Sequence, residues 1–203
     1  MKSERISLIE AKERLLRLSN LADYAVVTMS AAARHCGGVR VSAAELAAGQ
    51  DLRLVVYDGL RTVDAQARML ETRRVQDNPQ WLEAPRLLSP PGSGAHPRGM
   101  AVDCSLETLG GALLDMGCAF DFLAADPSPA VNPAHRDYAG HSADVVRNRG
   151  ILDGVMGDAA ARCGVEMLGL PQEWWDFRVP RAVYEAYAPL SDADLPPKMR
   201  MCS

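Results

Sequence analysis

The chain is predicted to fold as a single α+β domain, and three features of the sequence indicate it. Short apolar runs typical of strands interleave with helical patterns, without the regular strand–helix period of a doubly wound sheet. A length of 203 residues suits one domain with a sizeable core. No internal repeat or low-complexity tract divides it. We therefore expect one domain over residues 1–203, built on a small, mainly antiparallel sheet flanked by helices.

The first elements are expected to be a helix, a strand and a second helix. A capping-box pattern followed by apolar residues at helical spacing predicts a helix over residues 8–19. The apolar run 52–57 predicts a strand, which ends at the turn Asp58-Gly59. Residues 62–75 favour a helix. This order places Arg61 at a strand-to-helix junction.

A loop and further strands are expected in the middle of the chain. Prolines and glycines exclude a regular element over residues 85–94, so this segment is a loop that leads to His96. Residues 100–106 alternate sufficiently for a strand, which would carry Asp103. Residues 112–115 form a second, shorter strand candidate.

The last third begins with a long polar loop that contains several prolines together with His135 and His141. Unstructured loops of this length are usually functional or mobile. Ser142 is an N-cap candidate for a helix that Gly164 would stop. A final apolar stretch then leads to Glu173 and two tryptophans.

Composition excludes several classes of protein. The net charge is -4 and no basic cluster is longer than Arg73-Arg74, so nucleic acid is not an expected partner. The N-terminus lacks the apolar core of a secretory signal and no apolar run is long enough to span a membrane, so we expect a cytoplasmic protein without a membrane partner. Five scattered cysteines without CxxC spacing indicate reduced thiols. The sequence leaves the oligomeric state open.

Four residues have the types that a catalytic metal site uses. His96 and Asp103 lie seven apart, and Glu173 stands three residues before Asp176. An imidazole and a carboxylate make two of the three protein ligands of a catalytic zinc, which keeps one position open. Taken singly, a loop histidine is commonly a surface residue and a strand aspartate commonly an ion-pair partner. The spacing therefore allows two interpretations: a metal site, or a surface histidine and an ion-paired aspartate without a metal.

Five short motifs surround these four residues along the chain. They are HxxGxAxD at the histidine, Asp58-Gly59-Leu60-Arg61 upstream of it, and three segments downstream: residues 115–121, Asn148-Arg149 and Glu173-Trp174-Trp175. Together, over roughly residues 52–178, they resemble the D-alanyl-D-alanine dipeptidases of the vancomycin-resistance type. The resemblance implies an α+β zinc peptidase that acts on peptidoglycan-related D-amino-acid peptides.

The resemblance also implies roles for individual residues. His96 and Asp103 match two zinc ligands, and Glu173 matches the base that deprotonates the attacking water and then protonates the leaving amine. Arg61 matches the arginine that stabilises the oxyanion. Asp121 matches the carboxylate that receives the amino group of the dipeptide.

Other positions have weaker or alternative interpretations. Trp174 is expected to form core and pocket wall. Ser93 lies one step before Gly94, where the family has a serine, and is assigned to substrate binding. Arg61 could instead cap the adjacent helix or pair with Asp58.

The main departure from the family is Asp176, which stands where a histidine supplies the third ligand. A second carboxylate would lower the net charge of a zinc centre from +1 to 0, and its hard oxygen favours iron or manganese. The predicted ligands are thus His96, Asp103 and Asp176, with Zn²⁺ as cofactor and Fe²⁺ or Mn²⁺ as alternatives. A histidine of the long loop is another possible third ligand. Asp176→His is expected to tighten zinc binding.

The sequence thus predicts a metal-dependent hydrolase whose substrate is a D,D-dipeptide or a related small amide, with Glu173 as the base. Two alternatives stay open. One is a repurposed small-molecule tailoring enzyme with a His/Asp/Asp metal site, and the other is an inactive, ligand-binding pseudoenzyme. Retention of Glu173 favours an enzyme, because a protein without turnover does not need a base.

Overall fold

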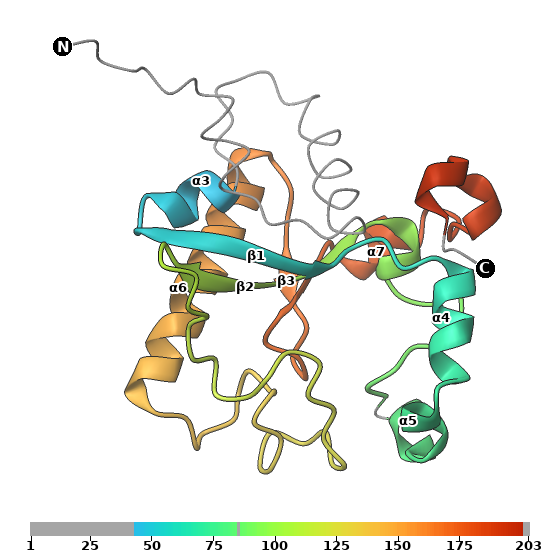
Figure 1. The fold of residues 1–203 in the computed structure, drawn as a ribbon, viewed down its shortest axis with the longest axis horizontal. Helices are drawn as coiled ribbons and strands as arrows, with labels where there is room; N and C mark the ends of the chain where they lie inside the picture. The colour runs from blue at the N-terminus through green and yellow to red at the C-terminus, as the bar shows by residue number, and fades with distance from the viewer. Residues whose placement is uncertain (1–42, 85, 201–203) are drawn as a thin grey trace, which may run out of the picture.

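The computed structural model describes residues 43–84 and 86–200, and a four-stranded sheet forms its centre (Figure 1). The strands are β1 (Leu52–Asp58), β2 (Ala101–Thr108), β3 (Leu168–Gly169) and β4 (Asp176–Arg178). Their order is β1-β2-β4-β3, and every neighbouring pair is antiparallel. The predicted α+β class with a small antiparallel sheet is confirmed.

Helices lie at both ends of this sheet. In Figure 1, α3 (Ala43–Ala48) and α6 (Ala143–Arg162) lie at one end, where α3 contacts both β1 and α6. At the other end lie α4 (Val63–Leu70), α5 (Arg73–Gln76) and α7 (Arg181–Tyr184). The structure also has four short 3-10 turns among its described residues: η1 (Pro79–Leu82), η2 (His96–Arg98), η3 (Asp192–Asp194) and η4 (Pro197–Met199).

The main core is built around β2, whose first six residues are buried irrespective of the sheet face they point to. Val102, Cys104 and Leu106 lie in one hydrophobic cluster with α6 and the tryptophans that precede β4. Full burial of a large apolar side chain contributes about 1.5–3 kcal/mol. The strand that carries Asp103 is therefore rigidly held.

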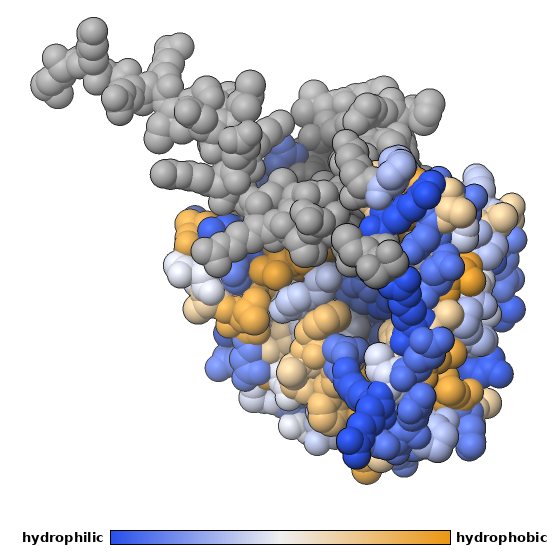
Figure 2. Space-filling model, turned by 45° about the vertical axis from the view of Figure 1, so that its right-hand side comes forward, coloured by the Kyte–Doolittle hydropathy of each residue, from blue (hydrophilic) through white to orange (hydrophobic). Residues whose placement is uncertain are grey.

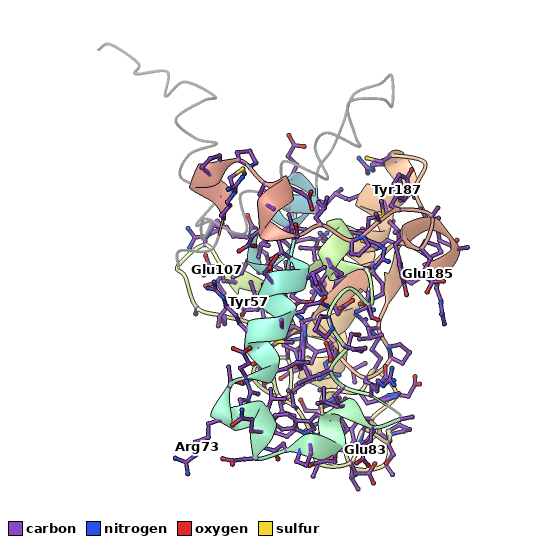
Figure 3. The ribbon with its side chains drawn as sticks, turned by 90° about the vertical axis from the view of Figure 1, so that its right-hand side faces the viewer. Tyr57, Arg73, Glu83, Glu107, Glu185 and Tyr187 are labelled. Carbon is purple, nitrogen blue, oxygen red and sulfur yellow. The ribbon has the colours of Figure 1, made fainter. Side chains whose placement is uncertain are left out.

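A β-bulge at Tyr57 re-aims the end of β1. The register with β2 shifts between Val56 and Asp58, so that Asp58 comes to lie opposite Asp103. Bulges bend a strand and redirect a side chain in this way. In Figure 3 the labels of Tyr57 on β1 and Glu107 on β2 lie close together on one side of the molecule, in agreement with the pairing of these two strands.

Several predicted elements are confirmed. β1 and β2 cover the expected strands, and Arg61 lies between β1 and α4 as expected. α6 begins after Ser142, whose Oγ accepts a hydrogen bond from the Val145 N–H, and ends before Gly164, which has φ of +67°. The predicted loop over 85–94 holds no helix or strand in its described part. The helix predicted over 8–19 lies outside the described residues.

Two predicted elements differ. The helix expected over 62–75 is broken into α4 and α5, because the Thr72 hydroxyl donates to the Met69 carbonyl and a new turn starts at Thr72. The short strand expected over 112–115 is reduced to one isolated bridge between Glu107 and Leu113. The Asp115 carbonyl accepts instead from Asn148 of α6, so the chain leaves the sheet.

The surface is mixed in character. On the face shown in Figure 2, hydrophilic residues run beside patches of hydrophobic ones. Among the described helices, none combines the length and apolar character that crossing a membrane requires. A single domain over the whole of residues 1–203 stays a prediction.

Candidate metal site

Three aspartates form a row across the sheet. Asp58 of β1 is paired in register with Asp103 of β2, and Asp103 is paired with Asp176 of β4. The side chains of Asp103 and Asp176 are only 3% and 1% exposed, so their charges need partners within the protein. The antiparallel register therefore gathers carboxylates from three distant parts of the sequence.

His96 reaches the middle of this row from η2. Its Nδ1 lies 2.7 Å from the Gly59 carbonyl, which can only accept, so Nδ1 carries a proton. Its Nε2 lies 3.2 Å from Asp176 Oδ2 and 3.4 Å from Asp103 Oδ1. In a neutral imidazole the Nε2 lone pair would face two carboxylates. A positive charge, either a proton or a metal ion, must therefore lie there.

Two arginines hold the outer carboxylates of the row. Arg61 Nε and Nη2 lie 2.7 and 2.6 Å from Asp58 Oδ2, and Nη2 also lies 3.3 Å from Asp103 Oδ2. Arg178 Nε donates to Asp176 Oδ1 at 2.7 Å, and its Nη2 pairs with Asp176 Oδ2. Asp103 Oδ1 in the middle is buried and has no hydrogen-bond partner among residues 43–84 and 86–200. The oxygen without a donor thus faces His96 Nε2.

The electrostatics follow from this arrangement. Burial alone would lower the pKa of His96, but the nearby Asp103 carboxylate and the hydrogen bond to Asp176 outweigh it and raise that pKa to about 10. Burial opposes ionisation of Asp176, yet its hydrogen bonds with His96 and Arg178 hold its pKa well below the usual range. Without a metal ion, the structure therefore favours a protonated His96.

These residues fit a divalent cation. One nitrogen or oxygen from each of Asp58, His96 and Asp103 lies within 4.8 Å of the others, and Asp176 is not part of that described group. A histidine whose second nitrogen donates to a carbonyl is the usual arrangement behind a metal ligand. The unpartnered Asp103 Oδ1 is a further donor. Imidazole with carboxylate oxygens suits zinc, iron or manganese.

Glu173 lies in the turn that leads into β4 and is buried. Burial, followed by the negative charges of Asp176 and Asp103, raises the pKa of Glu173 to about 8. The charges of His96 and Arg178 act in the opposite direction. A carboxyl group with this pKa near the site cluster suits the gain and loss of a proton at neutral pH.

Trp174 lines a cavity of about 340 Å³ on the side of the sheet that includes Ser105 and Tyr57. Its ring is buried and its Nε1 has no hydrogen-bond partner in the described structure. Ser105 is two residues from Asp103 on β2, so both point to the same face of the sheet. The cavity and the aspartate row thus share a face.

The other predicted site residues make their contacts with residues outside the aspartate row. The Asp121 carboxylate pairs with Arg74 of α5 and is 48% exposed. Ser93 is exposed, and its carbonyl accepts from Gln66. His135 Nδ1 accepts from the Asp137 N–H, and His141 packs against Tyr138. Neither loop histidine belongs to the described metal-ligating group.

Two members of the cluster were not predicted as site residues. The sequence places Asp58 in the motif upstream of His96 and makes it a possible ion-pair partner of Arg61, which it is. Arg178 belongs to none of the motifs, although residues two apart on a strand share a face and Arg178 follows Asp176 at that spacing. The strand assignment of residues 176–178 was the missing signal.

Comparisons with known proteins give matches at three levels. The peptidase M15 family, described as D-ala-D-ala dipeptidase, matches residues 30–191. The D-alanyl-D-alanine dipeptidase of Escherichia coli strain K12 is 32% identical over 144 residues, which cover 70% of this chain and 61% of the relative. An L-Ala D-Glu endopeptidase structure from Serratia marcescens, ChiX, has 16% identity and a TM-score of 0.37, covering 70% of this chain and 78% of that one.

Proposed function

Because the chain belongs to the D-ala-D-ala dipeptidase family, we propose that it is a metal-dependent hydrolase of D-alanyl-D-alanine or a related small amide. One observation carries the metal dependence. His96 Nε2 faces two buried carboxylates, and the nearest oxygen of Asp103 has no donor in the described part of the chain. A cation at this point would satisfy all three groups.

His96 and Asp103 would hold the ion, with the flanking carboxylates close by. Zn²⁺ is proposed, with Fe²⁺ or Mn²⁺ as alternatives because the cluster is rich in oxygen donors. When bound, such an ion supplies a Lewis acid that polarises the scissile carbonyl and makes water more acidic. The Gly59 carbonyl keeps His96 in the tautomer that leaves Nε2 available.

Glu173 is proposed as the base. Its carboxylate would take a proton from the attacking water and return it to the leaving amine, so that no net proton is consumed. A divalent cation nearby would lower the pKa of Glu173 from its metal-free value of about 8 and favour the ionised, accepting form at neutral pH. The Glu173 carboxyl is close enough to Asp176, Asp103, Arg178 and His96 for their charges to act on its pKa, and this supports the proposal.

Arg61 and the cavity are proposed to bind the substrate. Arg61 is fixed by Asp58, and the N–H groups of its guanidinium would stabilise the oxyanion that forms on the scissile carbonyl. Trp174 would form the wall of the substrate pocket. Asp121 is proposed to receive the free amino group, which requires it to exchange its present partner Arg74 for the substrate ammonium. Ser93 would lie at the pocket rim.

A ligand-binding pseudoenzyme is the second candidate, because Asp176 stands where the family has a histidine ligand and lies outside the group of potential ligand atoms found among the described residues. In that case the protein would bind a dipeptide without cleaving it.

The test is release of D-alanine from D-alanyl-D-alanine by protein loaded with Zn²⁺, Fe²⁺ or Mn²⁺, followed with a coupled oxidase. We expect turnover with at least one ion and none after chelation. Dipeptide binding without D-alanine release, under all three ions, would establish the pseudoenzyme instead.

A further inference from the structure

We propose that Asp176 and Arg178 act together as one neutral oxygen ligand, with Arg178 as the positioning residue that makes a second carboxylate acceptable beside the cation site. This inference rests on the metal site of the proposed function. It concerns a residue, Arg178, that neither the sequence motifs nor the family match assigns a role.

The geometry of the pair supports it. Arg178 Nε donates to Asp176 Oδ1 at 2.7 Å, while Nη2 engages Oδ2, so the guanidinium fork grips both oxygens. Asp176 and Arg178 share a face of β4. The Asp176 side chain is 1% exposed and that of Arg178 18%, so water screens neither charge well. The fork also fixes which way Asp176 Oδ2 points, namely to His96 Nε2 at 3.2 Å.

Charge counting shows what the pair achieves. A divalent ion with neutral His96, the Asp103 carboxylate and the neutral Asp58–Arg61 ion pair has a formal charge of +1. An unpaired Asp176 would reduce it to 0, whereas the Asp176–Arg178 pair adds no net charge and leaves it at +1. The ion therefore keeps the Lewis acidity expected of a centre with a single uncompensated carboxylate.

This changes the expectation for Asp176→His. An imidazole is a neutral ligand and needs no cationic partner. With Asp176 replaced, the Arg178 guanidinium would stay beside the divalent ion without its bidentate carboxylate partner. The single substitution should therefore fail to tighten zinc binding, and removal of Arg178 should be needed as well.

The experiment measures the zinc Kd of three proteins by competition with a chromophoric chelator: wild type, Asp176→His, and Asp176→His with Arg178→Met. We expect Asp176→His to bind zinc no tighter than wild type. We expect the double variant to bind at least tenfold tighter than Asp176→His. The unfolding midpoint of metal-free Asp176→His should also fall, and recover in the double variant, since only the single variant leaves a poorly solvated unpaired cation.

The matched control is Asp176→His with Arg53→Met. Arg53 also forms an ion pair on this sheet, 3.0 Å from Glu107, but away from the aspartate row. Its removal should leave the zinc Kd of Asp176→His unchanged. If Asp176→His alone binds zinc tighter than wild type and equals the double variant, or if the double variant binds no zinc, the inference is overturned. If the zinc Kd values follow the prediction but the protein releases no D-alanine, the result counts against the proposed function alone.

Discussion

Asp103 is the residue on which the proposed cation site depends most, because it is the buried centre of the aspartate row and one of its oxygens has no donor among the described residues. Asp103→Asn should weaken zinc binding more than about 100-fold, beyond the 10–100-fold range for residues that only support a ligand. Competition with a chelator measures this. Glu107→Gln, on the same face of β2 but paired with Arg53, should leave zinc binding unchanged. Equal effects of the two substitutions would exclude Asp103 as a ligand.

Glu173 should separate metal binding from turnover. Glu173→Gln removes the proton acceptor but keeps the shape, so we expect stoichiometric zinc and a kcat lower by about 10²–10⁴-fold. Metal content and kcat are measured on the same preparation. Glu166→Gln, an exposed substitution before β3, serves as the control and should not change kcat. A Glu173→Gln protein that retains wild-type kcat would place the base elsewhere.

The sequence motifs predict part of the arrangement that the structure shows. His96 and Asp103 come together as their spacing suggests, and Arg61 lies at the junction expected for it. The motifs could not show that Asp103 and Asp176 lie opposite each other, because cross-strand register is a tertiary property. The ion pairs of Arg178 with Asp176 and of Arg74 with Asp121 also depend on the tertiary structure, so the motifs could not predict them.

At the scale of elements, α6 holds the long loop in place through Arg149. Its guanidinium donates to the carbonyls of Met116, Pro133 and His135, so that one buried side chain fixes three loop positions. Arg149→Met should lower the free energy of unfolding by about 3 kcal/mol or more, because buried carbonyls lose their donors. Urea unfolding measures the change.

The control for this prediction lies on the same helix. Arg147 is exposed and pairs only with the exposed Asp144 in the described structure, so Arg147→Met should change stability by less than about 0.5 kcal/mol. A loss for Arg149→Met as small as that would show that the loop does not depend on α6.

Element boundaries were predictable where local signals are strong. Ser142 and Gly164 mark the two ends of α6 in the sequence itself. In the structure Ser142 is the N-cap and Gly164 has a positive φ. The break between α4 and α5 depends on a side-chain bond of Thr72, and the loss of the 112–115 strand depends on acceptor carbonyls claimed by α6. Such competition between partners is not visible in periodicity.

For the whole molecule, the site cluster predicts that metal-free protein loses stability as pH rises. The pKa of His96 is raised from 6.5 to about 10 and that of Glu173 from 4.5 to about 8, so the folded state binds these protons more tightly than the unfolded state. Their contribution is complete below each unfolded value and is lost as pH rises through each folded value. The unfolding midpoint should fall from about pH 4.5 to pH 10, first through Glu173 and then through His96, and the fall above pH 6.5 should be smaller in His96→Gln.

The same protons link the site to its cation. A metal ion on Nε2 must displace the proton of His96, and its charge should also favour ionisation of Glu173, so that binding releases up to two protons, one from each. The measurement is a calorimetric zinc titration of metal-free protein at pH 7 in two buffers of different ionisation enthalpy. We predict one ion per chain with proton release, and loss of saturable zinc binding in His96→Gln, which lacks the imidazole ligand. Binding without proton release, or no saturable binding, would contradict a cation site at His96 and Asp103.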